Sequence, residues 1–221
     1  MRKKFLEELN ALNIELISMG SMCGEAIAIT IKETLQNDYD GALYEKVSKL
    51  EDDIDRKEKY IEALCMKMIY SWQPVAKDLR FINAILRMIA DLERIGDQAL
   101  DIANLLKEFK YTTLIKDTDL PKMFNTVLMM VNESVRAFVK RDINLAKEVI
   151  AKDNEVDEIF LNIKNQVIIL IEKEDNSRDI VDILMIAKYL ERIGDHAVNV
   201  AEWVDFSITG THKSKHSDLE Q

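Results

Sequence analysis

One pentapeptide, Glu-Arg-Ile-Gly-Asp, occurs twice in this chain, at residues 93–97 and at residues 191–195. The surrounding residues also correspond, at a separation of 98 near the pentapeptide and of 102 further upstream. The corresponding pairs include Arg80 with Arg178, Ile85 with Ile183, Leu92 with Leu190, Asp40 with Asp142, Val47 with Val149, Glu51 with Asp153 and Asp55 with Asp157. An internal repeat of this length predicts that the chain builds the same structural unit twice. The change in separation places four extra residues in the first copy, near positions 72–76.

Each unit is predicted to be helical, because the residues that form the turns of sheets are scarce. Among 221 residues there are six Gly and two Pro, too few for a sheet-rich fold. Apolar residues instead recur every three or four positions, as on the buried face of a helix. Near the N-terminus this stripe consists of Phe5, Leu9, Leu12, Leu16, Met19, Cys23 and Ala26. We therefore predict an all-α fold with six long helices, arranged as two tandem, similar antiparallel three-helix bundles.

The predicted boundaries follow from turn residues and from breaks in the apolar stripes. The first bundle is predicted to occupy residues 1–110 and the second residues 122–208, with a linker at residues 111–121 between them. Residues 209–221 form a tail that we expect to be disordered. Turns within the bundles are predicted at residues 37–41, 71–74, 140–142 and 173–177. Asp40 and Asp78 are predicted to cap the second and third helices, because Asp is a preferred N-cap residue.

Charge and cysteine content exclude several kinds of protein. The chain has 30 basic and 40 acidic residues, a net charge of −10, whereas a nucleic-acid partner requires a basic surface. The spacing of Cys23 and Cys65 matches no motif, and their apolar surroundings indicate reduced thiols in a cytosolic core rather than a disulfide framework. No charge-free run approaches the roughly 20 residues of a membrane span. We expect a cytoplasmic protein that reaches a membrane only through its partners.

Acidic pairs with a spacing of four residues are the strongest candidates for a functional site. Each pair places two carboxylates on one helix face, although like charges at this spacing repel by a few tenths of a kcal/mol. The pairs are Glu51 with Asp55, Glu93 with Asp97, Asp153 with Asp157 and Glu191 with Asp195. Asp101 extends the second pair along its helix, and Asn199 extends the fourth.

The two pairs of each bundle are predicted to lie side by side. In an antiparallel helical hairpin, residues equally distant from the turn face each other. The first two pairs are centred on positions 53 and 95, whose midpoint is Pro74 in a predicted turn. The last two are centred on positions 155 and 193, whose midpoint, 174, also lies in a predicted turn. Four carboxylates would converge in each bundle, and such oxygen ligands bind hard or borderline cations.

The same residues also allow a structural interpretation. Arginines could neutralise the carboxylates in ion pairs, and spacing alone does not decide between ion pairs and a metal. The arginines in question are Arg80, Arg94, Arg178 and Arg192. Gly96 and Gly194, in the middle of predicted helices, indicate the close approach of a neighbouring helix. His196 is interpreted as a packing or surface residue rather than as a ligand.

The repeated pentapeptide, the acidic pairs and the segment Gln-Pro-Val-Ala-Lys-Asp-Leu-Arg at residues 73–80 resemble those of the PhoU family. The resemblance covers the chain from about Leu9 to Phe206. It implies a fold of two similar three-helix bundles and a role in regulating phosphate uptake and phosphate signalling in the cytosol.

The resemblance also implies partners and metal ligands. It implies a negative regulator of the phosphate-starvation response that acts between the ATPase of a phosphate ABC transporter and a sensor histidine kinase, and we expect a homodimer. Members of the family can bind multinuclear iron or zinc clusters through these acidic pairs. The ligands implied here are Glu51, Asp55, Glu93, Asp97, Asp101, Asp153, Asp157, Glu191, Asp195 and Asn199. The family commonly has Asn at the position of Asp101, so the first cluster would have one more negative ligand than the second.

Two other functions are compatible with the carboxylates. A carboxylate-bridged metalloenzyme typically has Glu-x-x-His on two helices, but none of the three His residues here has Glu three positions earlier. A helical scaffold without metal is the second alternative. The sequence also contains no Gly-rich phosphate loop and no nucleophile elbow, so we favour a regulator that is not an enzyme.

Overall fold

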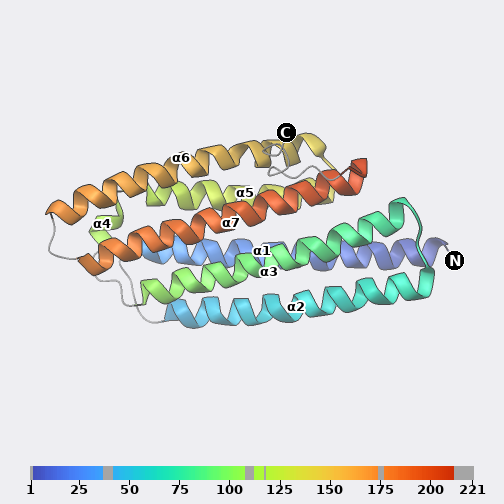
Figure 1. The fold of residues 1–221 in the computed structure, drawn as a ribbon. Helices are drawn as coiled ribbons and strands as arrows, with labels where there is room; N and C mark the ends of the chain where they lie inside the picture. Colours follow the sequence, from blue (N-terminus) through green and yellow to red (C-terminus); the bar gives the residue numbers. More distant parts are fainter. Residues whose placement is uncertain (1, 37–41, 108–111, 117, 174–176, 212–221) are drawn as a thin grey trace.

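The computed structural model describes residues 2–36, 42–107, 112–116, 118–173 and 177–211. Over these residues the chain forms seven helices and no strands (Figure 1). They are α1 (Arg2–Gln36), α2 (Ala42–Trp72), α3 (Lys77–Leu106), α4 (Thr112–Lys116), α5 (Leu120–Lys140), α6 (Ile143–Lys173) and α7 (Ser177–Thr209). All but α4 are long, so the predicted all-α fold is confirmed.

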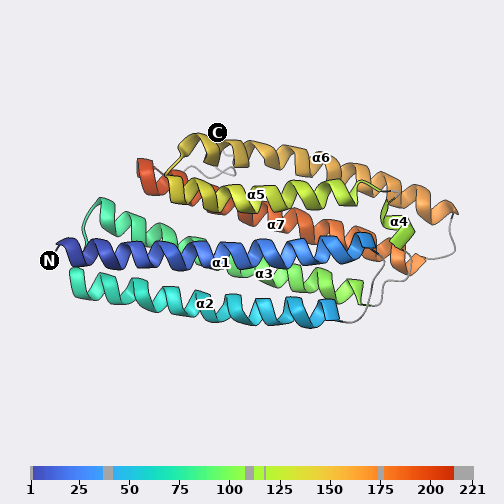
Figure 2. The same ribbon diagram turned by 180° about the vertical axis from the view of Figure 1, so that it is seen from behind.

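The long helices form two three-helix bundles that lie side by side. The first consists of α1, α2 and α3, and the second of α5, α6 and α7. The bundles join along α3 and α7, which form the most extensive helix contact of the molecule (Figure 1). On the opposite face, α1 packs against α5 (Figure 2). The predicted tandem bundles are confirmed, and they share one elongated body.

The apolar stripes form one continuous core through both bundles. On α1, Leu12, Leu16 and Met19 are fully buried. Burial of a large aliphatic side chain contributes about 1.5–3 kcal/mol, so these stripes drive the packing of the helices. Cys23 and Cys65 are free thiols in this core, as predicted. Burial raises the pKa of each thiol to about 12, so both are protonated at neutral pH.

Residues 2–32 of α1 are long and apolar enough to cross a membrane, with a mean hydropathy of 1.5 over an 18-residue window. Half of that window is buried inside the protein. The buried face of α1 contacts α2, α3 and α5. This packing is typical of a core helix, and core helices can be as long and as apolar as membrane spans. The length and composition of α1 are therefore weak support for a membrane span.

The predicted linker of residues 111–121 contains more regular structure than the sequence indicated. Helix α4 occupies Thr112–Lys116, and its Ile115 is fully buried. Helix α5 already begins at Leu120, so Pro121 lies in its first turn rather than before it. Proline suits this position because the first helical N–H groups have no acceptor within the helix.

The turns between helices correct one predicted cap and confirm one predicted break. Helix α3 begins at Lys77 and its N-cap residue is Ala76, which makes no side-chain capping bond. Asp78 is therefore inside the first turn, and its prediction as a cap is wrong. The predicted break at residues 140–142 is confirmed, and Asp142 caps α6 by accepting bonds from two backbone N–H groups. The predicted cap Asp40 and the tail beyond residue 211 lie outside the described residues.

Several glycines mark the places where helices approach closely. A Cβ atom on Gly96 would lie 3.1 Å from Cδ1 of Ile54, and one on Gly194 would lie 3.6 Å from Cγ1 of Val156. The close approach predicted from these glycines is therefore confirmed at Gly96, whereas a Cβ at Gly194 would make only ordinary van der Waals contacts. Gly20 is more constrained, because its Cβ would lie 2.6 Å from Cγ2 of Val135 on α5.

Candidate functional site

The first acidic cluster consists of Glu51 and Asp55 on α2 and of Glu93 and Asp97 on α3. The hairpin turn at residues 73–76 places the two helices antiparallel, as the midpoint of the pairs predicted. Burial raises the pKa of Glu51 above its ordinary value, and the charges of Asp97, Asp55 and Glu93 raise it further. Charges on both helices therefore act on one carboxyl group, which indicates that the four predicted acids of the first bundle lie near one another.

Two further acids border the first acidic cluster. Burial, and then the charge of Asp97, raise the pKa of Asp101, which was predicted as a ligand. Burial and the charge of Asp55 also raise the pKa of Glu58. Glu58 was not predicted as a site residue, although it follows Asp55 by three residues and continues the same helix face.

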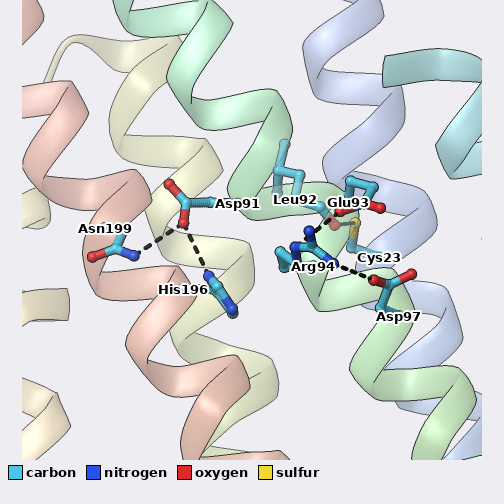
Figure 3. A network of polar contacts seen from close by, with 8 residues as sticks. All are labelled: Cys23, Asp91, Leu92, Glu93, Arg94, Asp97, His196 and Asn199. Carbon is cyan, nitrogen blue, oxygen red and sulfur yellow. Dashed lines mark hydrogen bonds and ion pairs between the residues drawn. The ribbon is translucent and has the colours of Figure 1, made fainter. Parts of the chain in front are cut away.

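Cations offset part of this negative charge. The Arg94 guanidinium donates to Asp97 at 3.0 Å, and its Nε lies 3.5 Å from Glu93 (Figure 3). Lys59 donates to Asp55 at 2.6 Å. The ion pairs considered as the structural alternative are thus present for Arg94. They are largely exposed, and exposed pairs contribute no more than about 1 kcal/mol each.

The second acidic cluster consists of Asp153 and Asp157 on α6 and of Glu191 and Asp195 on α7. Burial raises the pKa of Asp195 to about 6, and the charges of Glu191, Asp153 and Asp157 contribute to this shift. Lys188 forms an ion pair with Glu191, and its positive charge opposes the upward shift in the pKa of Asp195. The four predicted acids of the second bundle are therefore also brought together.

The donor set of both clusters is made of carboxylate oxygens, which suits a hard cation such as ferric iron better than a soft one. Mutual repulsion within each cluster would also be relieved by a bound cation. Among the described residues, however, no three His, Cys, Asp or Glu side chains are already arranged to hold a metal ion. Asp55, Asp97 and Glu191 are instead turned towards basic side chains of their own helices.

Asn199, the tenth predicted ligand, makes a different contact. Its Nδ2 donates to Oδ1 of Asp91 on α3 at 3.0 Å, and His196 Nδ1 lies 2.9 Å from the same oxygen (Figure 3). The side chains of Asp91 and His196 are only 14% and 21% exposed. We call these three residues the junction triad, because they join the two bundles across α3 and α7. Its Asp91 was not singled out from the sequence, since it belongs to no repeated pattern.

The fold and the paired clusters define a class of helical proteins in which two similar three-helix bundles each carry carboxylates on two adjacent helices. The chain belongs to the PhoU family, because the PhoU domain matches residues 16–106 and 120–204. The expected resemblance is thereby confirmed.

Relatives of similar length support this assignment. The chain is 36% identical to the phosphate-specific transport system accessory protein PhoU homolog of Clostridium acetobutylicum, over 95% of this chain and 96% of that protein. It is 38% identical to the protein of the same name from Aquifex aeolicus, over 86% of each. Both alignments include the two bundles.

Solved structures share the fold. The crystal structure of PhoU from Pseudomonas aeruginosa matches with a TM-score of 0.84 and 29% identity, over 94% of this chain and 100% of that one. The phosphate transport system regulatory protein PhoU from Streptococcus pneumoniae matches with a TM-score of 0.81 and 23% identity, over 95% and 99% of the two chains. At that identity the second match concerns the fold alone.

Proposed function

We propose that this protein is a cytoplasmic, metal-binding regulator of phosphate uptake, which restrains the phosphate-starvation response. It would do so by linking the ATPase of a phosphate ABC transporter to a sensor histidine kinase. The observation that carries the proposal is membership of the PhoU family along both bundles, together with relatives named as accessory proteins of phosphate-specific transport. We further propose that it acts as a homodimer and without catalysis of its own.

The two acidic clusters are the proposed metal-binding part. Glu51, Asp55, Glu93 and Asp97 would hold a cation in the first bundle, with Asp101 beside them, and Asp153, Asp157, Glu191 and Asp195 would hold one in the second. A bound iron or zinc ion would supply positive charge where like charges now repel. The proposal is supported by the raised pKa values of Glu51 and Asp195, which burial raises most and neighbouring carboxylates raise further.

A co-purification experiment tests the regulatory role. At high phosphate, the untagged chain should be recovered with the tagged transporter ATPase and with the tagged kinase, each at a stoichiometry well above that of an unrelated tagged protein. Recovery with neither partner would contradict the proposal. Recovery with only one of them would contradict the link between the two.

Metal binding is tested by replacing acids with their amides. Glu93→Gln combined with Asp97→Asn should remove the metal of the first cluster and halve the total content measured by elemental analysis. Helical content, measured by circular dichroism, should not change. The matched control combines Glu7→Gln with Glu158→Gln, which neutralises two exposed acids outside both clusters. An equal metal loss in the control would contradict the assignment.

A scaffold without metal is the second candidate, and the ion pairs of Lys59, Arg94 and Lys188 favour it. In that case the carboxylates need no cation beyond those of their own helices. Elemental analysis of protein purified without an affinity tag separates the two candidates. Metal below one tenth of an equivalent, after growth with added iron and zinc, would support the scaffold.

A further inference from the structure

A partly enclosed cavity of about 260 Å³ lies away from both acidic clusters. The turn between α2 and α3, the turn between α5 and α6 and the C-terminal end of α7 gather at this end of the molecule (Figures 1 and 2). The charged residues that line the cavity are Lys77, Arg80, Arg141 and Asp78. Leu9, Phe81 and Ile208 supply apolar walls. It is large enough for a small ion with several waters.

The charge of this cavity is opposite to that of the whole chain. Three cations line it against one carboxylate, although acids outnumber basic residues by 40 to 30 overall. Within the described residues, none of the three cations forms an ion pair with a carboxylate. An excess of cationic over anionic side chains around a cavity attracts anions.

The Arg80 side chain is a partly buried member of this lining. Its Nε atom is buried and has no hydrogen-bond partner among the described residues. A Cβ atom added to Gly210 would lie only 2.1 Å from Nη1 of Arg80. Gly210 has a φ of 82°, a left-handed backbone conformation that favours glycine. A buried donor without an acceptor is unfavourable, and an anion would remove that cost.

The Arg141 side chain also lines the cavity and lies over an aromatic ring. Its guanidinium carbon lies 4.9 Å from the centroid of the Phe81 ring, which stacks on Phe138 at 5.0 Å. Arg141 ends α5 with a left-handed φ of 52°, at a position where glycine is usual. Gln73 and Ala76, in the turn between α2 and α3, are the other described non-glycine residues with positive φ. Such backbone conformations cost free energy and are concentrated at functional sites.

We propose that this cavity binds a tetrahedral oxyanion of the phosphate type, through Arg80, Arg141 and Lys77. Planar guanidinium groups present pairs of N–H donors that match the oxygens of phosphate, and the Lys77 ammonium adds a point charge. The phosphate is either a free ion or the head group of a phosphomonoester. The proposal rests on the residues of the cavity and is independent of metal binding and of the partners proposed above.

Calorimetric titration of the full chain with inorganic phosphate tests the proposed binding. The buffer contains a metal chelator, and sodium chloride keeps the ionic strength constant. Wild type should bind one equivalent per chain. Arg80→Gln should weaken binding at least tenfold. Lys77→Gln, at an exposed position, should weaken it about two- to fivefold. The matched control is Arg178→Gln, the equivalent of Arg80 in the second repeat, which should bind as wild type does.

Three further titrations identify the ligand class. Sulfate should compete with phosphate, because it has the same shape, whereas acetate at the same concentration should not. Glycerol 3-phosphate binding more tightly than phosphate would support the head group of a phosphomonoester, and weaker binding would support the free ion. Absence of phosphate binding by wild type, equal competition by acetate, or unchanged affinity in both Arg80→Gln and Lys77→Gln would overturn the proposal. Binding without recovery of the ATPase or kinase would contradict only the regulatory role.

Discussion

The Asp195 carboxyl group links the second acidic cluster to the stability of the fold. Its pKa in the folded protein is about 6, above the ordinary value of 3.8, because burial and neighbouring acids disfavour its charged form. The folded state therefore binds this proton more tightly than the unfolded chain does. The resulting contribution to stability is complete below about pH 4 and is lost as the pH rises through 6.

Asp195→Asn should consequently raise the thermal stability of the metal-free protein at pH 8. Because the side chain is partly exposed, we expect a gain of no more than about 1 kcal/mol, or about 2–4 °C. At pH 4 the gain should disappear, since the wild-type carboxyl is then protonated as well. Thermal unfolding at both pH values, with Glu158→Gln as control, measures the effect. A gain of equal size at pH 4 would indicate packing instead of charge.

Residue spacing predicted which carboxylates come together, but not which contacts each one makes. The four acids of each cluster follow from a helical period of 3.6 and the position of a turn, and both are local properties. Asn199 has the same spacing from Asp195, yet it donates to Asp91 on a helix of the other bundle. That contact depends on how the bundles are rotated against each other, which no local pattern encodes.

At the scale of helices, Gly194 and Gly96 should respond differently to the same substitution. Alanine in a helix is up to about 1 kcal/mol more stable than glycine. At Gly194 the new Cβ has ordinary contacts, so Gly194→Ala should raise the melting temperature by about 2–4 °C. At Gly96 the Cβ would press on Ile54 Cδ1, and the gain should be smaller.

Combining Gly96→Ala with Ile54→Val checks the reason for that difference. Valine lacks the Cδ1 atom, so the double variant should be more stable than the sum of the two single changes in the free energy of unfolding predicts. Thermal unfolding of the four proteins gives the interaction free energy. Strict additivity would show that Ile54 does not limit the substitution.

The contact between α1 and α5 should tolerate no added methyl group. In Gly20→Ala the new Cβ would lie 2.6 Å from Val135 Cγ2, and overpacking of this kind costs about 1–3 kcal/mol. We expect a melting temperature several degrees lower than that of wild type. Val135→Ala in the same chain should restore part of the loss, because it removes the clashing atom. A neutral effect of Gly20→Ala would contradict the tight packing.

The apolar stripes predicted which parts of the chain are helical. They did not predict where each helix begins, because that depends on backbone geometry in the turns. Ala76 begins α3 with a φ of 49°, and no residue-type preference predicts alanine there. The short α4 has five residues, too few for a helical period to be seen in the sequence. Both differences arise in connections, where tertiary contacts outweigh local preference.

At the scale of the whole molecule, the junction triad should contribute to the attachment of one bundle to the other. Asp91→Ala removes the acceptor shared by His196 and Asn199, and a buried hydrogen-bonding group left without a partner costs about 1–3 kcal/mol. We expect the melting temperature to fall by several degrees. Asp91→Asn keeps an acceptor oxygen and should lose less. Equal losses in both variants would indicate that the charge of Asp91, and not its acceptor, matters.

The packing of α3 on α7 could not be predicted, because the repeat describes each bundle and contains no information on their arrangement. Both helices have apolar faces broad enough to be buried on more than one side. Only the structure reveals that these two helices, which carry the pentapeptides, are neighbours (Figure 1).

The junction triad also makes the two halves of the chain unequal as binding partners. At a separation of 98, the counterparts of Asp91, His196 and Asn199 are Tyr189, Gln98 and Asp101, which cannot form the same set of bonds. Two copies of either half, docked in the same way, would not reproduce this set of bonds. The two repeats therefore present different, complementary residues to each other at this contact. Separately produced halves should pair one to one with each other in preference to themselves.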